Sequence, residues 1–543
     1  VLYKYRITDV QLANGYIKNI TLESSDGTKL GKSIAAKVFI DCTYEGDLMA
    51  KAGVSYIIGR EDNKQYGETY NGVQLMKGHQ FPDGVDPYKI KGDSTSGLLW
   101  GISPAALSSD GTGDKLVQAY NYRICLTDNP ANKIEITRPE NYDSTKYELL
   151  LRLFDAQPNK RKLNHYFIWS RMPNNKTDIN NRGGFSTDMI GMNHNYPEAS
   201  YEERAEIIKA HKDYTQGLLY FYKTDPRVPQ ELRDEIQAWG YPKDEYTEDN
   251  HWSPQLYIRE SRRMTGDYVM TQAHCEGRET VTDGIGMAAY TMDSHNCQRL
   301  LVKKDGKYIV KNEGNVEIGG GLPYPISYRS IIPKEEECKN LLVPVCLSAS
   351  HIAYGSIRME PVFMVLAQSA AIAAAEAINT GSVQTVDIKK VQALLHENPL
   401  LDDSFSEILI DDSELDLSIN NDWEVIKKQG GYGPTFLKSK VRNGSPVRFS
   451  PHMEHEGKYK VYTYYHMRKD ISPAITYSIS NGIDSWTRVI HKDSVRIEGQ
   501  TTGEWIELGT YNFQKSSMPY IEISTGDTSG AVIADAVLFI PVK

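Results

Sequence analysis

Few cysteines and no long apolar run are present in this chain of 543 residues. The six cysteines are widely spread and none forms a Cys-x-x-Cys pair, which argues against a disulfide framework and against a structural zinc site. The longest nearly uncharged run, residues 361–375, is interrupted by Gln368 and Ser369 before it reaches the ~18 apolar residues of a membrane-spanning helix. No membrane span is therefore expected.

An excess of basic charge and a secretory signal are also missing. The chain has 61 Lys and Arg against 71 Asp and Glu, a net charge of -10, which gives no general attraction to polyphosphate. Nucleic acid is therefore not expected as a partner. The first residues alternate apolar and polar side chains as a strand does, instead of passing from a basic to an apolar region. Any targeting segment is expected to have been removed or never to have been present.

Short-range patterns predict elements along the first part of the chain. Residues 1–40 alternate in polarity and contain the turn signals Asn14-Gly15 and Asp26-Gly27, which predicts an antiparallel ribbon. Residues 36–50 indicate a short strand, a polar turn and the start of a helix. The capping-box pattern that begins at Ser200 predicts a long helix.

Three further elements are predicted later in this part: a helix through residues 231–239, a buried strand at 341–345, and an Ala-rich helix over 362–378 that starts just after Pro361.

The composition changes after residue 410. Residues 411–422 are acidic and polar and indicate a solvated linker. From residue 423 onward, β-rich runs recur about every 8 to 12 residues between turn residues, which predicts a β-sandwich or jelly roll. The expected organisation is a body over 1–410, an acidic linker over 411–422 and an all-β domain over 423–543.

Three stretches of the body resemble one family. Residues 39–48 read Phe-Ile-Asp-Cys-Thr-Tyr-Glu-Gly-Asp-Leu, residues 257–268 contain Arg-Glu-Ser-Arg-Arg followed by Gly-Asp-Tyr, and residues 340–358 lead from a buried strand into the Pro361 helix. All three are similar to segments of the FAD-dependent oxidoreductases of the glutathione-reductase-like superfamily, in the group often labelled putative xanthan lyase. The resemblance implies an α/β or α+β FAD-binding body, here incomplete.

The resemblance also implies roles for individual residues. His351 is the candidate base, Arg358 and the Pro361 helix would stabilise a reduced flavin, and Arg259 and Arg263 would hold an acidic or hydroxylated substrate. The implied FAD contacts are Asp41, Thr43, Gly46, Asp47, Ser350, Gly355, Ser356 and Pro361. The implied substrate contacts are Arg123, Lys176, Asp178 and Asn180. Without the resemblance, the arginines are as readily explained as an ion-paired surface and the Ala-rich helix as core.

The phosphate-binding unit of that family is not visible. A flavin-binding Rossmann unit opens with a strand, a G-x-G-x-x-G turn and a helix, and no such unit precedes Asp41. Residues 284–289 fit G-x-G-x-x-A, but no convincing buried strand precedes them and no good helix follows. The intact parent is expected to bind FAD, and this chain to hold it weakly or not at all.

The last part of the chain resembles the golvesin C-terminal and xanthan-lyase-type carbohydrate-binding domains, on residues 503–511 and 532–537. This implies an extracytoplasmic protein that contacts polysaccharide, because aromatic faces stack on sugars. The candidate aromatic residues are Tyr462, Tyr464, Tyr465, Trp486 and Trp505. His452 and His455 would point to opposite faces of a strand, so no metal site is expected.

The favoured function is an FAD-dependent oxidoreductase that acts on a sugar or another small hydroxylated substrate in polysaccharide metabolism. Two alternatives stay open. One is a lyase for an acidic polysaccharide, in which an Arg neutralises the uronate and a Tyr or His removes the C5 proton. The other is a glycan-binding protein without catalysis. Substrate, electron acceptor and oligomeric state do not follow from the sequence.

Overall fold

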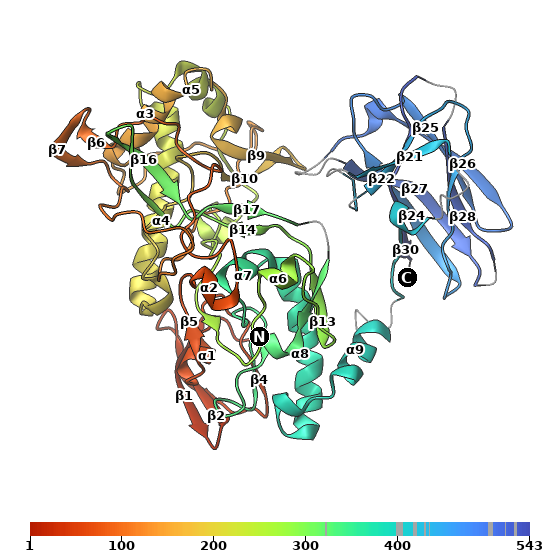
Figure 1. Cartoon of the computed structure of the whole chain (residues 1–543), viewed down its shortest axis with the longest axis horizontal. Helices are drawn as coiled ribbons and strands as arrows, with labels where there is room; N and C mark the ends of the chain where they lie inside the picture. Colours follow the sequence, from red (N-terminus) through yellow and green to blue (C-terminus); the bar gives the residue numbers. More distant parts are fainter. Residues whose placement is uncertain are drawn as a thin grey trace. The chain divides into compact units, whose positions relative to one another are not determined.

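The computed structural model describes residues 1–320, 323–397, 405–415, 421–427, 431–433, 435–497, 503–515, 517–525 and 529–542. The chain divides into two units, Val1–Gln392 and Ala393–Lys543, each with its own hydrophobic core (Figure 1). The first unit mixes helices and strands and the second is built from strands, as the sequence predicts.

The N-terminal ribbon is formed by β1 (Tyr5–Ala13), β2 (Tyr16–Ser24) and β3 (Lys32–Ile34), paired antiparallel in that order. Asn14 and Gly15 have φ angles of 55° and 78°, so both lie in the left-handed region that a tight hairpin turn requires. The ribbon is confirmed; the turn sets the pairing of Ala13 with Tyr16, and the register shifts between Gln11 and Leu12 and again between Ile7 and Asp9.

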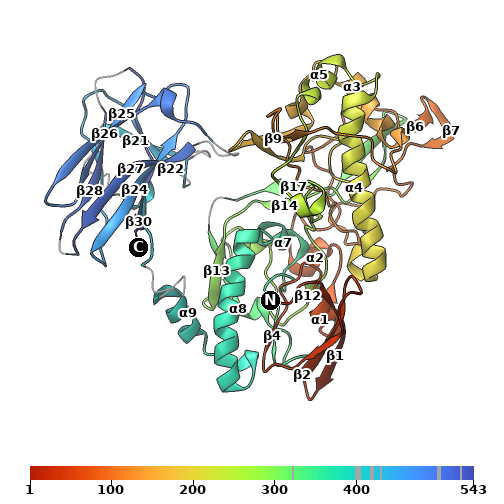
Figure 2. The same cartoon turned by 180° about the vertical axis from the view of Figure 1, so that it is seen from behind.

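A parallel strand pair follows the ribbon in the chain, and its first strand, β4 (Phe39–Ile40), lies beside the ribbon (Figure 2). β4 pairs with β19 (Leu341–Leu342), and the Phe39 and Asp41 amides donate to the Asn340 and Leu342 carbonyls at 2.8 Å. A turn joins β4 to α1 (Asp47–Lys51). β19 leads through a buried loop to α7 (His351–Ile357), so both strands end where the sequence analysis places the site.

Local signals explain the longest helices. α4 (Tyr201–Thr224) starts at Ser200, whose side chain accepts from the Glu203 amide while the Glu203 carboxylate accepts from the Ser200 amide. α8 (Glu360–Thr380) has Pro361 in its first turn. The other helices are α2 (Asn63–Tyr66), α3 (Glu148–Ala156), α5 (Gln230–Gln237), α6 (Gln272–Cys275) and α9 (Ile388–Glu397).

Among the described residues, α8 is the helix whose length and composition would allow it to cross a bilayer, and 39% of that apolar window is buried inside the protein. One face packs on β13, where Ser369 donates to the Ile285 carbonyl at 2.6 Å. Met364 and Ile378 on the other face are 72% and 45% exposed. One such helix is weak evidence for a span, because core helices have the same composition.

The remaining strands of the first unit form two-stranded antiparallel pairs. They are β5 (Tyr56–Ile57) with β12 (Arg263–Met264), β6 (Tyr88–Ile90) with β7 (Asp93–Leu98), β8 (Lys133–Ile134) with β11 (Tyr241–Pro242), β9 (Phe167–Met172) with β10 (Lys176–Asn181), β13 (Gly284–Ala288) with β18 (Tyr324–Ser327), β14 (Met292–Ser294) with β17 (Val316–Ile318), and β15 (Gln298–Lys304) with β16 (Lys307–Glu313). Short 3-10 turns are η1 (Ser144–Tyr147), η2 (Leu163–His165), η3 (Tyr196–Glu198), η4 (Thr247–Asp249), η5 (Tyr328–Ile331) and η6 (Val383–Thr385).

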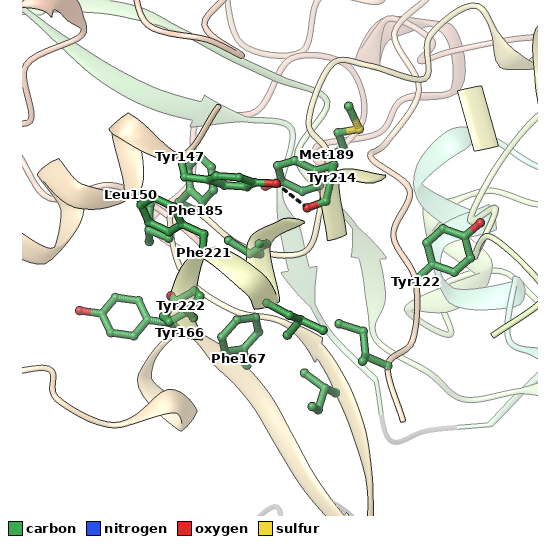
Figure 3. Close-up of a cluster of buried hydrophobic side chains, with 14 of the residues drawn as sticks. Tyr122, Tyr147, Leu150, Tyr166, Phe167, Phe185, Met189, Tyr214, Phe221 and Tyr222 are labelled. Atoms are coloured by element: carbon green, nitrogen blue, oxygen red, sulfur yellow. Dashed lines mark hydrogen bonds between the residues drawn. The ribbon is translucent and has the colours of Figure 1, made fainter. Parts of the chain in front are cut away.

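The core around α3 and α4 is unusually aromatic (Figure 3). Tyr147 packs against Tyr214 and Phe221 with ring centroids 5.8 and 5.0 Å apart, and its hydroxyl donates to the Tyr214 carbonyl at 2.8 Å. Tyr147 and Tyr214 therefore add apolar area while their hydroxyls keep a partner, since the Tyr214 hydroxyl donates to the Ser186 carbonyl at 2.7 Å. This packing makes a rigid support for the polar residues beside it.

The second unit is a sandwich. Its sheets have the orders β20-β30-β24-β27, β23-β28-β25-β26 and β21-β22-β29. Buried residues of β24 and β30, such as Val461 and Phe539, and of β25 and β28, such as Ile479 and Ile521, form one core. The elements are β20 (Ile408–Asp411), η7 (Asp412–Glu414), β21 (Trp423–Lys427), β22 (Thr435–Ser439), β23 (Val447–Phe449), β24 (Gly457–His466), β25 (Ala474–Ser480), β26 (Ser485–His491), η8 (Lys492–Ser494), β27 (Gly503–Phe513), β28 (Tyr520–Ser524), β29 (Ile533–Ala534) and β30 (Ala536–Pro541).

The boundary between the two units lies at residues 392–393, whereas the sequence predicts that the body ends at residue 410. β20 pairs with β30 along residues 408–411, and η7 follows it directly. Residues 408–414, which were assigned to the body and to the acidic linker, thus belong to the sandwich. The acidic residues that indicated a solvated linker are part of this unit, and one of them, Asp412, is buried in it.

Candidate functional site

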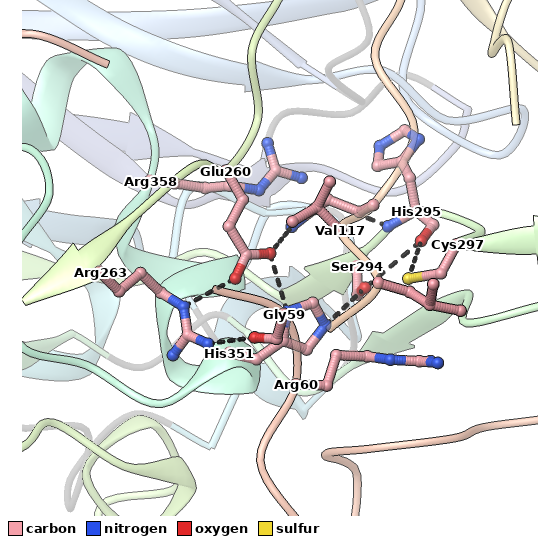
Figure 4. A network of polar contacts seen from close by, with 12 residues as sticks. Gly59, Arg60, Val117, Glu260, Arg263, Ser294, His295, Cys297, His351 and Arg358 are labelled. Atoms are coloured by element: carbon pink, nitrogen blue, oxygen red, sulfur yellow. Dashed lines mark hydrogen bonds and ion pairs between the residues drawn. The ribbon is translucent and has the colours of Figure 1, made fainter. Parts of the chain in front are cut away.

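Arg263 is the centre of a buried ionic network in the first unit (Figure 4). Its Nε donates to Glu260 Oε1 at 2.7 Å, and its Nη1 donates to Glu61 Oε1 and to the Ala349 carbonyl, both at 2.6 Å. Its Nη2 donates to the Gly59 carbonyl. With its side chain fully buried and each guanidinium nitrogen bonded, Arg263 holds three segments together, around residues 59–61, 260–263 and 349, and has no donor aimed at a ligand.

His351 begins α7 and lies in the same network. Its Nδ1 is 2.7 Å from Glu260 Oε2 and its Nε2 is 2.9 Å from Ser294 Oγ, so both ring nitrogens have protein partners. Burial raises the pKa of Glu260, but the charges of His351 and Arg263 outweigh it and lower the pKa to about 2. Ser294, His351 and Glu260 have the order of a nucleophile, a base and an orienting acid, yet Ser294 is fully buried. The arrangement fixes α7 against β14.

The start of α7 is neutralised by carboxylates of the chain itself. The His351 amide donates to Glu61 Oε2 at 2.9 Å, and the Ala353 amide donates to Ser350 Oγ at 3.3 Å. The Ser350 hydroxyl in turn donates to Glu68 Oε1 at 2.6 Å. The positive end of this helix is therefore already occupied.

Gly355 and Ser356 pack α7 against its neighbours. A Cβ at Gly355 would lie 2.7 Å from the Asp293 carbonyl oxygen. The Ser356 hydroxyl donates to the Tyr290 carbonyl at 2.5 Å and accepts from the Tyr324 hydroxyl at 2.8 Å. Both positions are explained by packing within the unit.

A second polar group, which we call the arginine cluster, comprises Asp188, Arg259, Asp293, His295 and Arg358. Arg259 Nη1 lies 3.0 Å from Asp188 Oδ1 and donates to the Ala119 carbonyl. Arg358 Nη2 donates to the Asp293 carbonyl and to Asp293 Oδ2, both at 3.1 Å, and its Nη1 donates to the Tyr257 hydroxyl at 3.3 Å.

Three buried guanidinium nitrogens in the arginine cluster have no acceptor among the described residues. They are Nε and Nη2 of Arg259 and Nε of Arg358. Elsewhere in the unit the same Nε and Nη2 edge of an arginine binds a carboxylate. Arg60 binds Asp114 in this way, and Arg123 binds Asp178. Arg259 therefore presents a free, buried fork of the kind that binds a carboxylate with two parallel hydrogen bonds. Buried donors without acceptors are rare in proteins.

His295 connects the two aspartates of the cluster. Its Nδ1 is 2.8 Å from Asp188 Oδ2, and its Nε2 is 3.6 Å from Asp293 Oδ2. Burial raises the pKa of Asp188, but Arg259 and His295 outweigh it, so the net shift is downward. The pKa of Asp293 is also lowered, because His295 and Arg358 overcome its burial. Both carboxylates are ionised at neutral pH.

The predicted FAD contacts in the turn after β4 are engaged within the turn. Asp41 accepts from the Thr43 amide and hydroxyl at 3.0 and 2.7 Å and from the Met49 amide at 2.9 Å. Gly46 has a φ of 67°, and a Cβ there would lie 2.9 Å from Met49 Cε. Asp47 is bound by Arg204 and Arg262. Pro361 is exposed at the start of α8.

The predicted substrate contacts lie on and beside the β9–β10 hairpin. Arg123 pairs with Asp178, and Lys176 pairs with Asp244 and Glu245 at 3.0 and 2.6 Å. These side chains are therefore partnered by the protein.

Among the predicted substrate contacts, Asn180 is linked by hydrogen bonds to a residue beside the arginine cluster. It accepts from Asn121 Nδ2 at 2.8 Å, and the Asn121 carbonyl accepts from the Tyr257 amide. Folding thus brings Arg259 and Arg358 together, with Arg263 and His351 in the adjoining network.

Sequence reasoning missed Asp188, Asp293 and His295. They lie in segments with no motif, and only long-range packing unites them with the arginines.

Comparison with protein-family models gives the affiliation. A model described as FAD dependent oxidoreductase matches residues 1–395, and a model described as Golvesin C-terminal domain matches residues 408–541. The chain belongs to the FAD dependent oxidoreductase family. A search of curated proteins found no match to this member of the family.

Solved structures resemble about a quarter of this chain. A xanthan lyase from Paenibacillus is 22% identical over 25% of this chain and 13% of its own, with a TM-score of 0.22. An exo-beta-1,3-galactanase from Phanerochaete chrysosporium is 14% identical over 25% and 29%, with a TM-score of 0.20. A GH26-CBM35 beta-(1,4)-mannanase from Podospora anserina is 10% identical over 25% and 28%, with a TM-score of 0.19. The matched part is less than a third of each of these proteins.

The side chains and amides at the predicted FAD positions are engaged by other groups of the protein. The turn residues after β4 and the amides at the start of α7 are bonded within the protein. The G-x-G-x-x-A letters at 284–289 fall largely in β13, which pairs antiparallel with β18 and opens no helix. A dinucleotide cradle requires a strand, a glycine turn and a helix start in sequence.

Proposed function

We propose that the arginine cluster is the substrate site of this oxidoreductase-family body and that its substrate is a sugar carrying a carboxylate, such as a uronic acid. The observation that carries the proposal is the free Nε and Nη2 edge of Arg259. A planar carboxylate would accept from both nitrogens, and Arg358 Nε would supply a further donor beside it. Sugar hydroxyls would find acceptors in Asp293 and donors in Tyr257.

His295 is the proposed proton acceptor of the cluster. Asp188 bonds its Nδ1, as in other Asp–His pairs where the acid orients the ring, and its Nε2 lies 3.6 Å from Asp293 Oδ2, a longer contact than either ring nitrogen of His351 makes. His351, the base expected from the family resemblance, would first have to break a bond to Glu260 or Ser294. The geometry therefore supports His295 in removing a proton from a substrate hydroxyl.

The second unit is proposed to bind polysaccharide, and the protein to act outside the cytoplasm. The match to the Golvesin C-terminal domain supports both statements. Tyr432, Tyr464 and Trp505 form an aromatic group with ring centroids 5.2 to 5.9 Å apart, and Tyr432 is 46% exposed. Such a surface can stack on sugar rings. A Trp505→Ala variant should lose retention on an affinity gel that contains the bound polysaccharide.

Titration calorimetry with D-glucuronate and D-glucose tests the substrate proposal. We expect saturable binding of D-glucuronate and at least tenfold weaker binding of D-glucose to the full chain. Arg259→Lys retains the charge but not the fork, so it should weaken D-glucuronate binding at least tenfold. The matched control is Arg329→Met, which removes a half-exposed arginine outside the cluster. Equal binding of the two sugars, or unchanged binding by Arg259→Lys, would contradict the proposal.

A lyase acting on an acidic polysaccharide is the second candidate, and one contact favours it. The Tyr257 hydroxyl accepts from Arg358 Nη1 at 3.3 Å, and an arginine beside a tyrosine suits neutralisation of a uronate and removal of its C5 proton. Ultraviolet absorbance of unsaturated uronate, formed from a polyuronate without any change of redox state, would favour this candidate. Binding of D-glucuronate with neither reaction would favour a glycan-binding protein.

A further inference from the structure

Three aspartates of the second unit lie close together outside the site described above. Asp411 ends β20, Asp412 begins η7, and Asp535 stands between β29 and β30. One carboxylate oxygen from each lies within 4.8 Å of the others. That spacing allows a single ion to contact all three carboxylates.

The fold brings these residues together from distant parts of the sequence. Asp411 is opposite Ala536 in the antiparallel pairing of β20 with β30, which places Asp535 beside it. Asp535 is the residue at which the chain passes from the sheet that contains β29 to the sheet that contains β30. The three carboxylates therefore meet at a junction of the sandwich, where backbone positions are held by both sheets.

The cluster has no opposing charge among the described residues. Asp412 and Asp535 are 2% and 0% exposed, and no described Lys, Arg or His forms an ion pair with any of the three aspartates. Three such groups repel one another unless a cation or protons compensate.

The hydrogen bonds of the cluster leave one oxygen without a partner. Asp535 accepts from the Tyr432 amide, Asp412 accepts from the Thr435 hydroxyl, and Asp411 Oδ2 accepts from the Ser413 amide and hydroxyl. Asp411 Oδ1 is buried and has no donor among the described residues. A buried carboxylate oxygen without a donor, in a residue close to two other carboxylates, is costly unless a cation or a proton compensates it.

We propose that Asp411, Asp412 and Asp535 bind a calcium ion. Ca²⁺ takes only oxygen ligands and accepts irregular geometry, which suits three carboxylates at a strand junction. Mg²⁺ gives up its water reluctantly and demands octahedral geometry, so it suits this buried site less well. The site would tie β20 and η7 to the β29–β30 junction and hold the backbone of Tyr432. It is independent of the arginine cluster and of any activity of the first unit.

Calorimetric unfolding of the full chain tests the calcium site. After treatment with EDTA, added CaCl2 should raise the midpoint of the second unit's transition, and an equal concentration of MgCl2 should raise it less. Titration calorimetry should show one calcium ion per chain. Asp535→Asn and Asp411→Asn should weaken calcium binding at least tenfold and remove the shift.

The variants also separate lost binding from lost folding. Because a carboxylate without a cation is repelled by its neighbours, Asp411→Asn in EDTA should unfold at the same temperature as the parent chain or higher. The matched control is Asp493→Asn, which removes an exposed carboxylate of the same unit and should leave calcium binding unchanged. No calcium uptake, or the same calcium-induced shift in Asp535→Asn as in the parent, would overturn the proposal.

Discussion

Replacement of Arg263 by Met should destabilise the first unit strongly. The change leaves two carboxylates, Glu61 and Glu260, with side chains 1% and 0% exposed and without their cation. Removal of one partner from a buried ion pair costs about 3–5 kcal/mol. The carbonyls of Gly59 and Ala349 also lose their donor, so we expect a decrease in the free energy of unfolding at the upper end of this range.

Urea unfolding read by pulsed hydrogen exchange of peptides from residues 1–392 measures this decrease separately from the second unit. Arg263→Lys keeps the charge but cannot reach all four acceptors, so its loss should be intermediate. Arg329→Met, at a half-exposed ion pair, should cost less than about 1 kcal/mol. A decrease of under about 1 kcal/mol in Arg263→Met would refute the view that this network is a structural centre.

The same method tests three further predictions. Ser200→Ala removes the cap of α4 and should cost about 1 kcal/mol, whereas no loss would contradict the capping box. Burial lowers the pKa of His211 to about 4, below its value in the unfolded chain. The free energy of unfolding should therefore fall by up to about 3 kcal/mol as the pH decreases from 6.5 to 4. His211→Gln should flatten this dependence. His351→Gln should lower the free energy of unfolding by about 1–3 kcal/mol, because it disturbs the bonds to Glu260 and Ser294. The same variant should keep the D-glucuronate affinity of the parent within twofold. A large loss of affinity would place His351 in the substrate site.

Elements with local signals could be predicted from the sequence. The Asn14-Gly15 turn, the cap at Ser200 and Pro361 at the start of α8 each act within a few residues, so their effects are visible in the order of the side chains. The strands of the sandwich were predicted for the same reason, since alternation and turn residues recur along the chain. β20 was missed because its pairing with β30 is long-range, and its acidic end reads as a linker.

The site could be predicted only in part. Arg259 and Arg358 lie in stretches that resemble the family, and the structure brings both into one cluster. The sequence does not show that Arg263 and His351 have all of their ring or guanidinium nitrogens bonded by buried groups. Nor does it show that His295 joins the cluster, because its bond to Asp188 depends on the packing of distant segments.

A crystal structure of the chain grown with D-glucuronate tests the central claim most directly. The account predicts the sugar carboxylate within hydrogen-bond distance of Nε and Nη2 of Arg259, with Arg358 beside it. Protein groups bonded to those two nitrogens, or the sugar bound elsewhere with the cluster closed, would contradict the account.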